Sequence, residues 1–135
     1  MVFTNGCFDI LHVGHVNYLE QARALGDYLV VALNSDRSVR ELKGKNRPIN
    51  DEKSRARVLA ALQCVDHVVV FKTKRVTPVI RKLRPQIYVK GGDYTVASLD
   101  SEERSAILAN RGIIKILPAW KGYSTTKTIQ RMKTK

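Results

Sequence analysis

Short apolar runs alternate along the chain with segments whose apolar residues repeat at helical spacing. The runs Leu29–Leu33 and Val68–Phe71 are uninterrupted, which is typical of strands in a parallel sheet that is covered on both faces. Between such runs, residues such as Val16, Leu19 and Ala22 recur at i and i+3, as on one face of a helix. The pattern predicts strands over 1–4, 28–33, 67–71, 87–90 and 113–117, and helices over 14–25, 51–62, 77–83, 100–110 and 125–132.

This alternation predicts the α/β class: a single Rossmann-like domain over residues 1–135, with a five-stranded parallel sheet and helices on both faces. We expect Gly26 to end the first helix in a left-handed conformation. No repeat or linker divides the chain. The one long irregular connection runs from residue 34 to residue 50 and is rich in arginine and lysine. Long loops in compact domains are usually functional.

The charge balance narrows the class of partner. The chain has 24 Lys and Arg against 12 Asp and Glu, a net charge of +12, which predicts a polyanionic partner: nucleic acid, an acidic membrane surface or a small phosphorylated substrate. No apolar run approaches the roughly 20 residues of a membrane span, and the N-terminus does not resemble a signal peptide. We therefore expect a cytoplasmic protein without membrane insertion. The 2 cysteines are far apart, which predicts neither a disulfide scaffold nor a structural metal.

Polar segments follow four of the predicted strands. Open parallel sheets bind ligands beyond the carboxyl ends of their strands, where the strand order reverses. Neither a GxxxxGKS or GxxxxGKT motif nor a GxGxxG motif occurs, which excludes P-loop and dinucleotide-binding sites. We expect a site of another kind at this edge of the sheet, built from segments 5–15, 34–47, 91–94 and 121–126.

Two histidines follow the first predicted strand. His12 and His15 lie three residues apart, on one face of the helix that begins there. A helix N-terminus offers free N–H groups and a partial positive charge, so phosphate is its natural ligand, and Gly14 would let a phosphate or a base approach the backbone closely. Two imidazole N–H donors would complete this phosphate cradle. Two alternatives stay open: the histidines only cap and pack, or they bind a metal together with Cys7 and Asp9.

These residues carry a family resemblance. His12-Val13-Gly14-His15 resembles the HxGH signature of the nucleotidyltransferase superfamily, and Gly122-Tyr123-Ser124-Thr125-Thr126 resembles the second signature of its cytidylyltransferase-like branch. Together the two signatures are more specific than either alone. Three further segments resemble the adenylyltransferase domain of ADP-heptose synthases: Asn34-Ser35-Asp36, Leu42-Lys43-Gly44 with Arg47-Pro48, and Lys90-Gly91-Gly92-Asp93-Tyr94.

The resemblance implies transfer of AMP from ATP to manno-heptose 1-phosphate, with Mg²⁺. Pyrophosphate would be released, and the product would be ADP-heptose, a lipopolysaccharide precursor. The resemblance also implies that the enzyme is a homodimer. A sugar phosphate is already an anionic nucleophile, so the enzyme needs no general base. Its task is to align the reacting groups and neutralise charge on the α-phosphate.

Residue roles follow by carry-over from the family. His12, His15 and Lys43 would be catalytic. Sugar phosphate would be bound by Asp9, Asn34, Asp36 and Arg47, and Asp9 would also help to hold Mg²⁺. The nucleotide and its phosphates would be bound by Asn5, Gly6, Cys7, Phe8, Gly14, Gly91, Gly92, Asp93, Ser124, Thr125 and Thr126. Ordinary turn chemistry is the alternative for Asn34, Asp36, Gly91 and Gly92, and a helix N-cap for Ser124 and Thr125.

Other functions stay open beside this one. The same framework serves glycerol-3-phosphate cytidylyltransferases and FAD synthetase-like enzymes, which transfer AMP to flavin mononucleotide. Ala119 stands where the former have an arginine, which argues against them. Bifunctional heptose enzymes carry a sugar kinase domain upstream, and this chain begins just before Asn5, so we expect a stand-alone transferase or a shortened form. The basic segments 72–84 and 127–135 would suit a nucleic-acid-binding module, a less favoured alternative.

Overall fold

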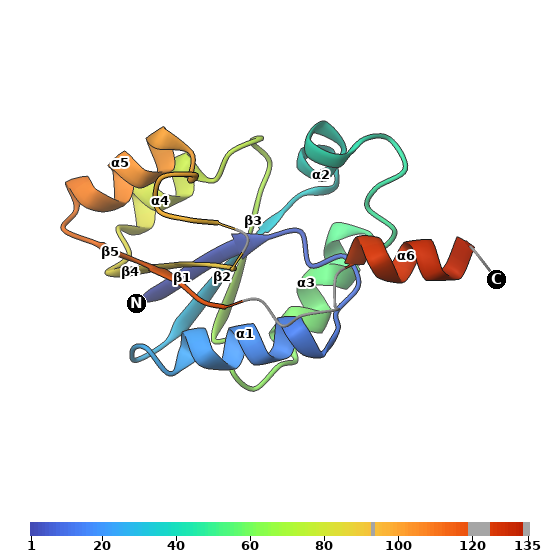
Figure 1. Ribbon diagram of the computed structural model, residues 1–135, viewed down its shortest axis with the longest axis horizontal. Helices are drawn as coiled ribbons and strands as arrows, with labels where there is room; N and C mark the ends of the chain where they lie inside the picture. Colours follow the sequence, from blue (N-terminus) through green and yellow to red (C-terminus); the bar gives the residue numbers. More distant parts are fainter. Residues whose placement is uncertain (93, 119–124, 134–135) are drawn as a thin grey trace.

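The computed structural model describes residues 1–92, 94–118 and 125–133, with the side chains of 125–128 left out. Strands and helices alternate along the chain (Figure 1). The elements are β1 (Val2–Gly6), α1 (Val13–Arg23), β2 (Leu29–Asn34), α2 (Asp36–Lys43), α3 (Glu52–Ala60), β3 (His67–Phe71), α4 (Thr77–Leu83), β4 (Ile87–Lys90), α5 (Ser101–Ala109), β5 (Ile113–Ile116) and α6 (Thr125–Lys133).

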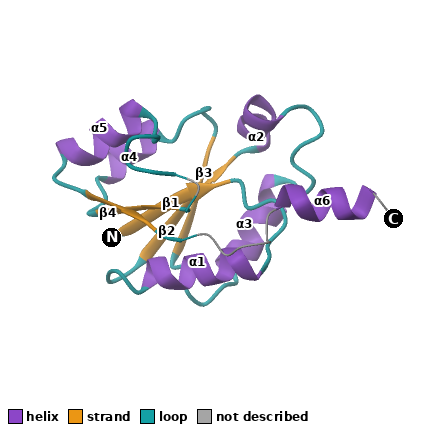
Figure 2. Cartoon of the chain, in the orientation of Figure 1, coloured by secondary structure: helices purple, strands orange, loops and turns teal. Residues whose placement is uncertain are grey.

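The five strands form one parallel sheet in the order β3-β2-β1-β4-β5. Helices α1 and α3 cover one face, and α4 and α5 cover the other (Figures 1 and 2). This arrangement confirms the predicted α/β class with a Rossmann-like sheet. Because the chain runs from β1 outward to β3 and then returns to place β4 beside β1, the strand order reverses between β1 and β4.

Two hydrophobic cores lie on the two faces of the sheet. Side chains of β2 alternate between them, since successive strand residues point to opposite faces, and all six β2 residues are buried. This double coverage explains why β2 has an unbroken apolar sequence. The first core includes Leu19, Leu29, Val31, Leu33 and Leu59, and the second includes Val30, Ala32, Phe71, Ile80 and Ile107.

Helix α2 corrects the expectation of an irregular connection over residues 34–50. Ser35 caps this helix, because its side chain accepts a hydrogen bond from the backbone N–H of Ser38 at 3.2 Å. Ser38 and Val39 are the residues that α2 buries. The helix has only two apolar residues, Val39 and Leu42, which lie three residues apart. Two positions are too few to distinguish a short amphipathic helix from a charged loop.

Gly26 does not end the first helix in a left-handed conformation, contrary to expectation. Helix α1 ends at Arg23, and its C-cap Ala24 keeps right-handed angles, with φ −67° and ψ −14°. Gly26 is needed for its size instead, because a Cβ atom there would lie 2.8 Å from Cγ2 of Val2. No helix in the described part of the chain is long and apolar enough to cross a membrane.

Candidate active site

A cavity of about 680 Å³ opens at the carboxyl ends of β1 and β4, where the strand order reverses. This is the predicted position for a ligand in an open parallel sheet. The structure brings most of the proposed site residues to this cavity. Those that line it are Asn5, Gly6, Cys7, Phe8, Asp9, His12, Gly14, His15, Asn34, Lys43, Arg47, Gly91 and Gly92.

The two histidines form the N-terminal cap of α1. Nδ1 of His12 accepts a hydrogen bond from the N–H of Gly14 at 3.1 Å, and Nδ1 of His15 accepts one from the N–H of His12 at 3.2 Å. The rings stack with their centroids 3.8 Å apart. A neutral imidazole whose Nδ1 accepts must carry its proton on Nε2. The two histidines therefore do cap the helix, and the same hydrogen bonds assign an Nε2–H donor to each ring.

Both rings are held in the neutral form. Burial, and then the neighbouring His12 and Lys43, lower the pKa of His15 to about 4. Burial also lowers the pKa of His12. Near neutral pH the pair therefore offers hydrogen-bond donors without a charge on either imidazole. Cys7, Asp9, His12 and His15 form no metal site, because no group of three His, Cys, Asp or Glu side chains converges within the described ranges.

A tight turn connects β1 to this helix. Phe8 lies in the left-handed region with φ 44°, which is uncommon for a residue with a side chain. Its ring packs on Gly6, where a Cβ atom would lie 2.9 Å from Cε2 of Phe8, and meets the ring of His15 edge-on with centroids 5.4 Å apart. Gly6 is therefore required by the close approach of Phe8, which in turn packs against the histidine pair.

Asp9 holds the segment after α2 against this turn. Its carboxylate accepts hydrogen bonds from Nε of Arg47 at 3.0 Å and from the backbone N–H groups of Ile49 at 2.8 Å and Asn50 at 2.9 Å. Burial alone would raise the pKa of Asp9, but these backbone hydrogen bonds and Arg47 lower it below its ordinary value. Asp9 therefore positions Arg47 at the cavity, whatever else it binds.

Arg55 is absent from the predicted site residues, yet it hydrogen-bonds to two residues that line the cavity, Cys7 and Asn34. This side chain is 2% exposed and its guanidinium donates to the carbonyl groups of Cys7, Asn34 and Asn50 and to Oδ1 of Asp36. Asp36 therefore pairs with Arg55 and is not among the residues that line the cavity. Asn34 does line it, while its Nδ2 donates to Oγ of Ser38 at 2.9 Å.

Some proposed residues cannot be placed. Asp93 and Ser124 lie outside the described residues, and for Thr125 and Thr126 only the helix α6 that they begin is described.

Sequence reasoning missed one wall of the cavity as part of the site. It is formed by Arg75, Ser98, Leu99, Asp100 and Glu103. Only Glu103 carries a readable signal, because it shares a helical face with Ala106 and Ile107, which are buried in the core. A carboxylate at such a position indicates a buried polar contact or a ligand site.

These features define a class of protein. Hydrogen-bond donors at a helix N-terminus, placed where the order of a parallel sheet reverses, are typical of Rossmann-like nucleotide-binding enzymes. The chain belongs to the cytidylyltransferase-like family, whose model matches residues 3–131, and it is a nucleotidyltransferase. This membership confirms the resemblance seen in the two sequence signatures.

Two bifunctional proteins are similar to this chain over almost its whole length. The bifunctional protein HldE of Koribacter versatilis is 54% identical over 131 residues, which are 97% of this chain and 26% of that protein. The HldE of Citrifermentans bemidjiense is 49% identical over 132 residues, which are 98% of this chain and 27% of that protein. The chain thus spans about a quarter of the length of these relatives.

Solved structures show the same architecture. A lipopolysaccharide core biosynthesis protein from Thermoplasma volcanium is 33% identical, with a TM-score of 0.70 over 90% of this chain and 96% of that one. Pantothenate synthetase from Thermus thermophilus is 15% identical, with a TM-score of 0.62 over 96% of this chain and 63% of that one, and shares the fold alone.

Proposed function

We propose that this enzyme transfers AMP from ATP to a sugar 1-phosphate, specifically manno-heptose 1-phosphate, and releases pyrophosphate. The observation that carries the proposal is that the two histidines cap the helix through Nδ1 and present Nε2–H donors at the cavity. Each Nδ1 accepts a backbone N–H, so both Nε2–H groups are donors at a cavity that Lys43 and Arg47 also line. The sequence segments that resemble ADP-heptose synthases support a sugar-phosphate acceptor, and the similarity to a lipopolysaccharide core biosynthesis protein agrees with an acceptor used in saccharide synthesis.

The chemistry requires alignment more than proton transfer. An oxygen of the sugar phosphate attacks the α-phosphorus of ATP, and the bond from that phosphorus to the bridging oxygen of the β-phosphate breaks, so that pyrophosphate leaves with the electron pair. The attacking oxygen is already anionic, so no base removes a proton. The Nε2–H groups of His12 and His15 would donate to phosphate oxygens as charge develops.

Cations of the cavity would neutralise the remaining charge. Lys43 ends α2 and is exposed at the cavity mouth, where it would reach phosphate oxygens as a flexible point charge. Arg47 uses Nε to bind Asp9, while its Nη2 is buried and has no hydrogen-bond partner among the described residues. That donor is left for a phosphate oxygen once the ligand enters. Arg75 also lines the cavity.

Magnesium belongs to the proposal, but the described residues supply little for it. The Asp9 carboxylate already accepts three hydrogen bonds within the chain, so it does not fit the role of a principal ligand. Mg²⁺ binds readily through substrate phosphates with few protein ligands. The triphosphate would therefore hold the ion, and the roles given above depend on none of its bonds.

Pyrophosphate release in the presence of Mg²⁺ tests the proposal. ATP and CTP are each combined with manno-heptose 1-phosphate, glycerol 3-phosphate and flavin mononucleotide. Release with ATP and the heptose phosphate alone is the expected result. Release with CTP and glycerol 3-phosphate, or with ATP and flavin mononucleotide, would assign another acceptor class. If no combination releases pyrophosphate and the protein binds RNA in a salt-sensitive way, a nucleic-acid-binding function would replace the proposal.

A further inference from the structure

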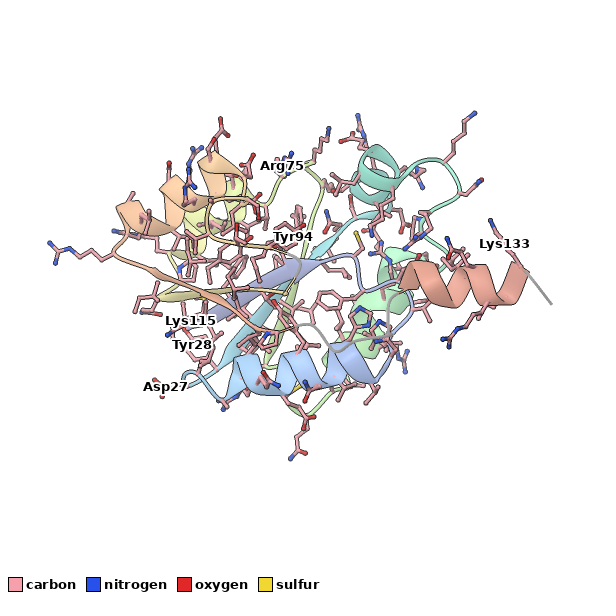
Figure 3. All side chains as sticks on the ribbon, in the orientation of Figure 1. Asp27, Tyr28, Arg75, Tyr94, Lys115 and Lys133 are labelled. Atoms are coloured by element: carbon pink, nitrogen blue, oxygen red, sulfur yellow. The ribbon has the colours of Figure 1, made fainter. Side chains whose placement is uncertain are left out.

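The wall of the cavity between β4 and α5 carries a hydrogen-bonded cluster with no role in the transfer described above. We call it the β4–α5 corner: Asn5, Tyr88, Lys90 and Glu103. Asn5, Lys90 and Glu103 line the cavity, whereas Tyr88 is fully buried behind them. Tyr94 and Arg75 line the same cavity (Figure 3), and Nζ of Lys90 lies 4.6 Å from the ring centre of Tyr94.

Tyr88 fixes the orientation of its two polar neighbours. Its hydroxyl lies 2.7 Å from Oδ1 of Asn5 and 2.8 Å from Oε1 of Glu103, and its one proton is shared between these two acceptors. Nζ of Lys90 also donates to Oδ1 of Asn5, at 3.3 Å. Burial, and then the Glu103 carboxylate, raise the pKa of Tyr88, so the phenol stays protonated as a donor.

Asn5 and Glu103 keep hydrogen-bonding capacity for a ligand. Asn5 directs its oxygen toward Tyr88 and Lys90, which leaves its Nδ2 donors without a partner in the described chain. Glu103 is 6% exposed, yet its Oε2 has no hydrogen bond within the described residues. Both residues line the cavity, where a ligand would meet them. A carboxylate oxygen that has no partner in the described chain can accept hydrogen bonds from such a ligand.

The mixture of groups selects a kind of ligand. Phosphate would be repelled by the Glu103 carboxylate and has its own donors at the histidine turn. A hydroxyl group both donates and accepts, and neighbouring hydroxyls of a sugar ring therefore match one carboxylate oxygen flanked by an amide and an ammonium donor. The corner provides these three groups at one place, held by Tyr88.

We propose that the β4–α5 corner binds sugar hydroxyls, with Glu103 as the acceptor, Asn5 and Lys90 as donors, and Tyr88 as the positioning residue. The proposal rests on the proposed function, which brings two sugars to this cavity: the ribose of the nucleotide and the ring of the acceptor. Either would supply the hydroxyls, and the experiment separates them.

The decisive variant is Glu103→Gln, which keeps the size of the side chain and removes the charge. Glu102→Gln is the matched control, because Glu102 is the preceding residue on α5 and is exposed. For both variants and the parent chain we would measure Kd for ATP, 2′-deoxy-ATP and 3′-deoxy-ATP by calorimetry, and KM and kcat for the sugar phosphate. Melting curves verify folding.

Loss of one charged hydrogen bond should weaken binding of the contacted sugar on the order of 10-fold or more. If the ribose is bound, Glu103→Gln raises Kd for ATP but not for the deoxy analogue that lacks the contacted hydroxyl. If the acceptor is bound, KM for the sugar phosphate rises while kcat and Kd for ATP hold. The proposal is overturned if Glu103→Gln leaves both Kd for ATP and KM for the sugar phosphate at the parental values. It is also overturned if Kd rises equally for ATP and both deoxy analogues while KM for the sugar phosphate does not change.

Tyr88→Phe keeps the test valid if Glu103→Gln does not fold. It retains the carboxylate, frees it from its positioning partner, and should weaken the same sugar by a smaller factor. If the parent chain turns over no sugar phosphate, the proposed function fails by itself. The Kd values for ATP and its deoxy analogues then still test binding of the ribose. Binding of the acceptor sugar is then tested by calorimetry with monosaccharide phosphates, in place of KM.

Discussion

Arg55 and Glu103 are two buried charged residues near the same cavity, exposed by 2% and 6%. They differ in how many of their hydrogen-bonding atoms have partners within the chain. The Arg55 guanidinium is bound from three atoms, Nε, Nη1 and Nη2, at distances of 2.8–2.9 Å, all within the chain. Glu103 lines the cavity, with one oxygen bound to Tyr88 and the other without a hydrogen bond within the described residues.

The difference separates scaffold from site. A buried charge whose partners all belong to the chain stabilises the arrangement of those partners, and its removal leaves them unpaired. A buried charge with spare capacity beside a cavity is arranged for a ligand. The same criterion places Lys43 with Glu103, because Lys43 lines the cavity and makes no hydrogen bond or ion pair within the described part of the chain. The histidine pair also lines the cavity, and its capping hydrogen bonds use the Nδ1 atoms, so that the Nε2 atoms carry the protons.

The largest expected effect is on stability, from Arg55→Met. This variant leaves the carbonyl groups of Cys7, Asn34 and Asn50 and the carboxylate of Asp36 without their donor, so the free energy of unfolding should fall by about 3–5 kcal/mol. Urea unfolding measures it. Arg57→Met, exposed on the same helix, should stay near the parent. Equal stability of the two variants would refute the scaffold role.

The next largest effect is on turnover, from His12→Asn. Asparagine is a good N-cap, so the variant keeps the hydrogen bond to the helix and should unfold within about 1 kcal/mol of the parent. It lacks the Nε2–H group, and kcat for pyrophosphate release should fall on the order of 100-fold. His67→Asn, on the exposed edge of β3, serves as the control. Near-parental kcat in the folded His12→Asn enzyme would remove the donor role.

His12 and Arg55 show which parts of the site could be predicted from the sequence. Apolar runs, two of them unbroken, predicted five strands and the parallel sheet, and the position of His12 after the first strand predicted its place at the cavity. Arg55 lies in phase with Leu59 on its helix, but its partners Cys7 and Asn34 are distant in sequence and meet it only in the folded chain. Glu103 was missed for the same reason, since its contact with Tyr88 is tertiary.

A smaller effect concerns pH and His15. Its pKa is about 4 in the folded chain and about 6.5 when unfolded, so below pH 6.5 the unfolded chain binds more protons. Stability should therefore be fully present above pH 6.5 and fall as the pH drops toward 4. The two pKa values alone correspond to about 3 kcal/mol at pH 4, and solvent screening of the half-buried ring reduces this to about 2 kcal/mol. Urea unfolding across this range should show a shallower slope for His15→Gln, which cannot protonate. Identical slopes in both chains would show that His15 is not held neutral.

The smallest expected effect, from Lys43→Ala, gives the opposite signature to Arg55→Met. Lys43 is exposed in the last turn of α2 and has no hydrogen bond or ion pair within the described part of the chain, so the free energy of unfolding should change by less than about 0.5 kcal/mol. Loss of a phosphate-directed charge should lower kcat/KM for ATP by roughly 10-fold. Lys45→Ala, also exposed but outside the cavity lining, is the control. A melting shift with unchanged kcat/KM would make Lys43 part of the scaffold, because a site residue must cost activity before it costs stability.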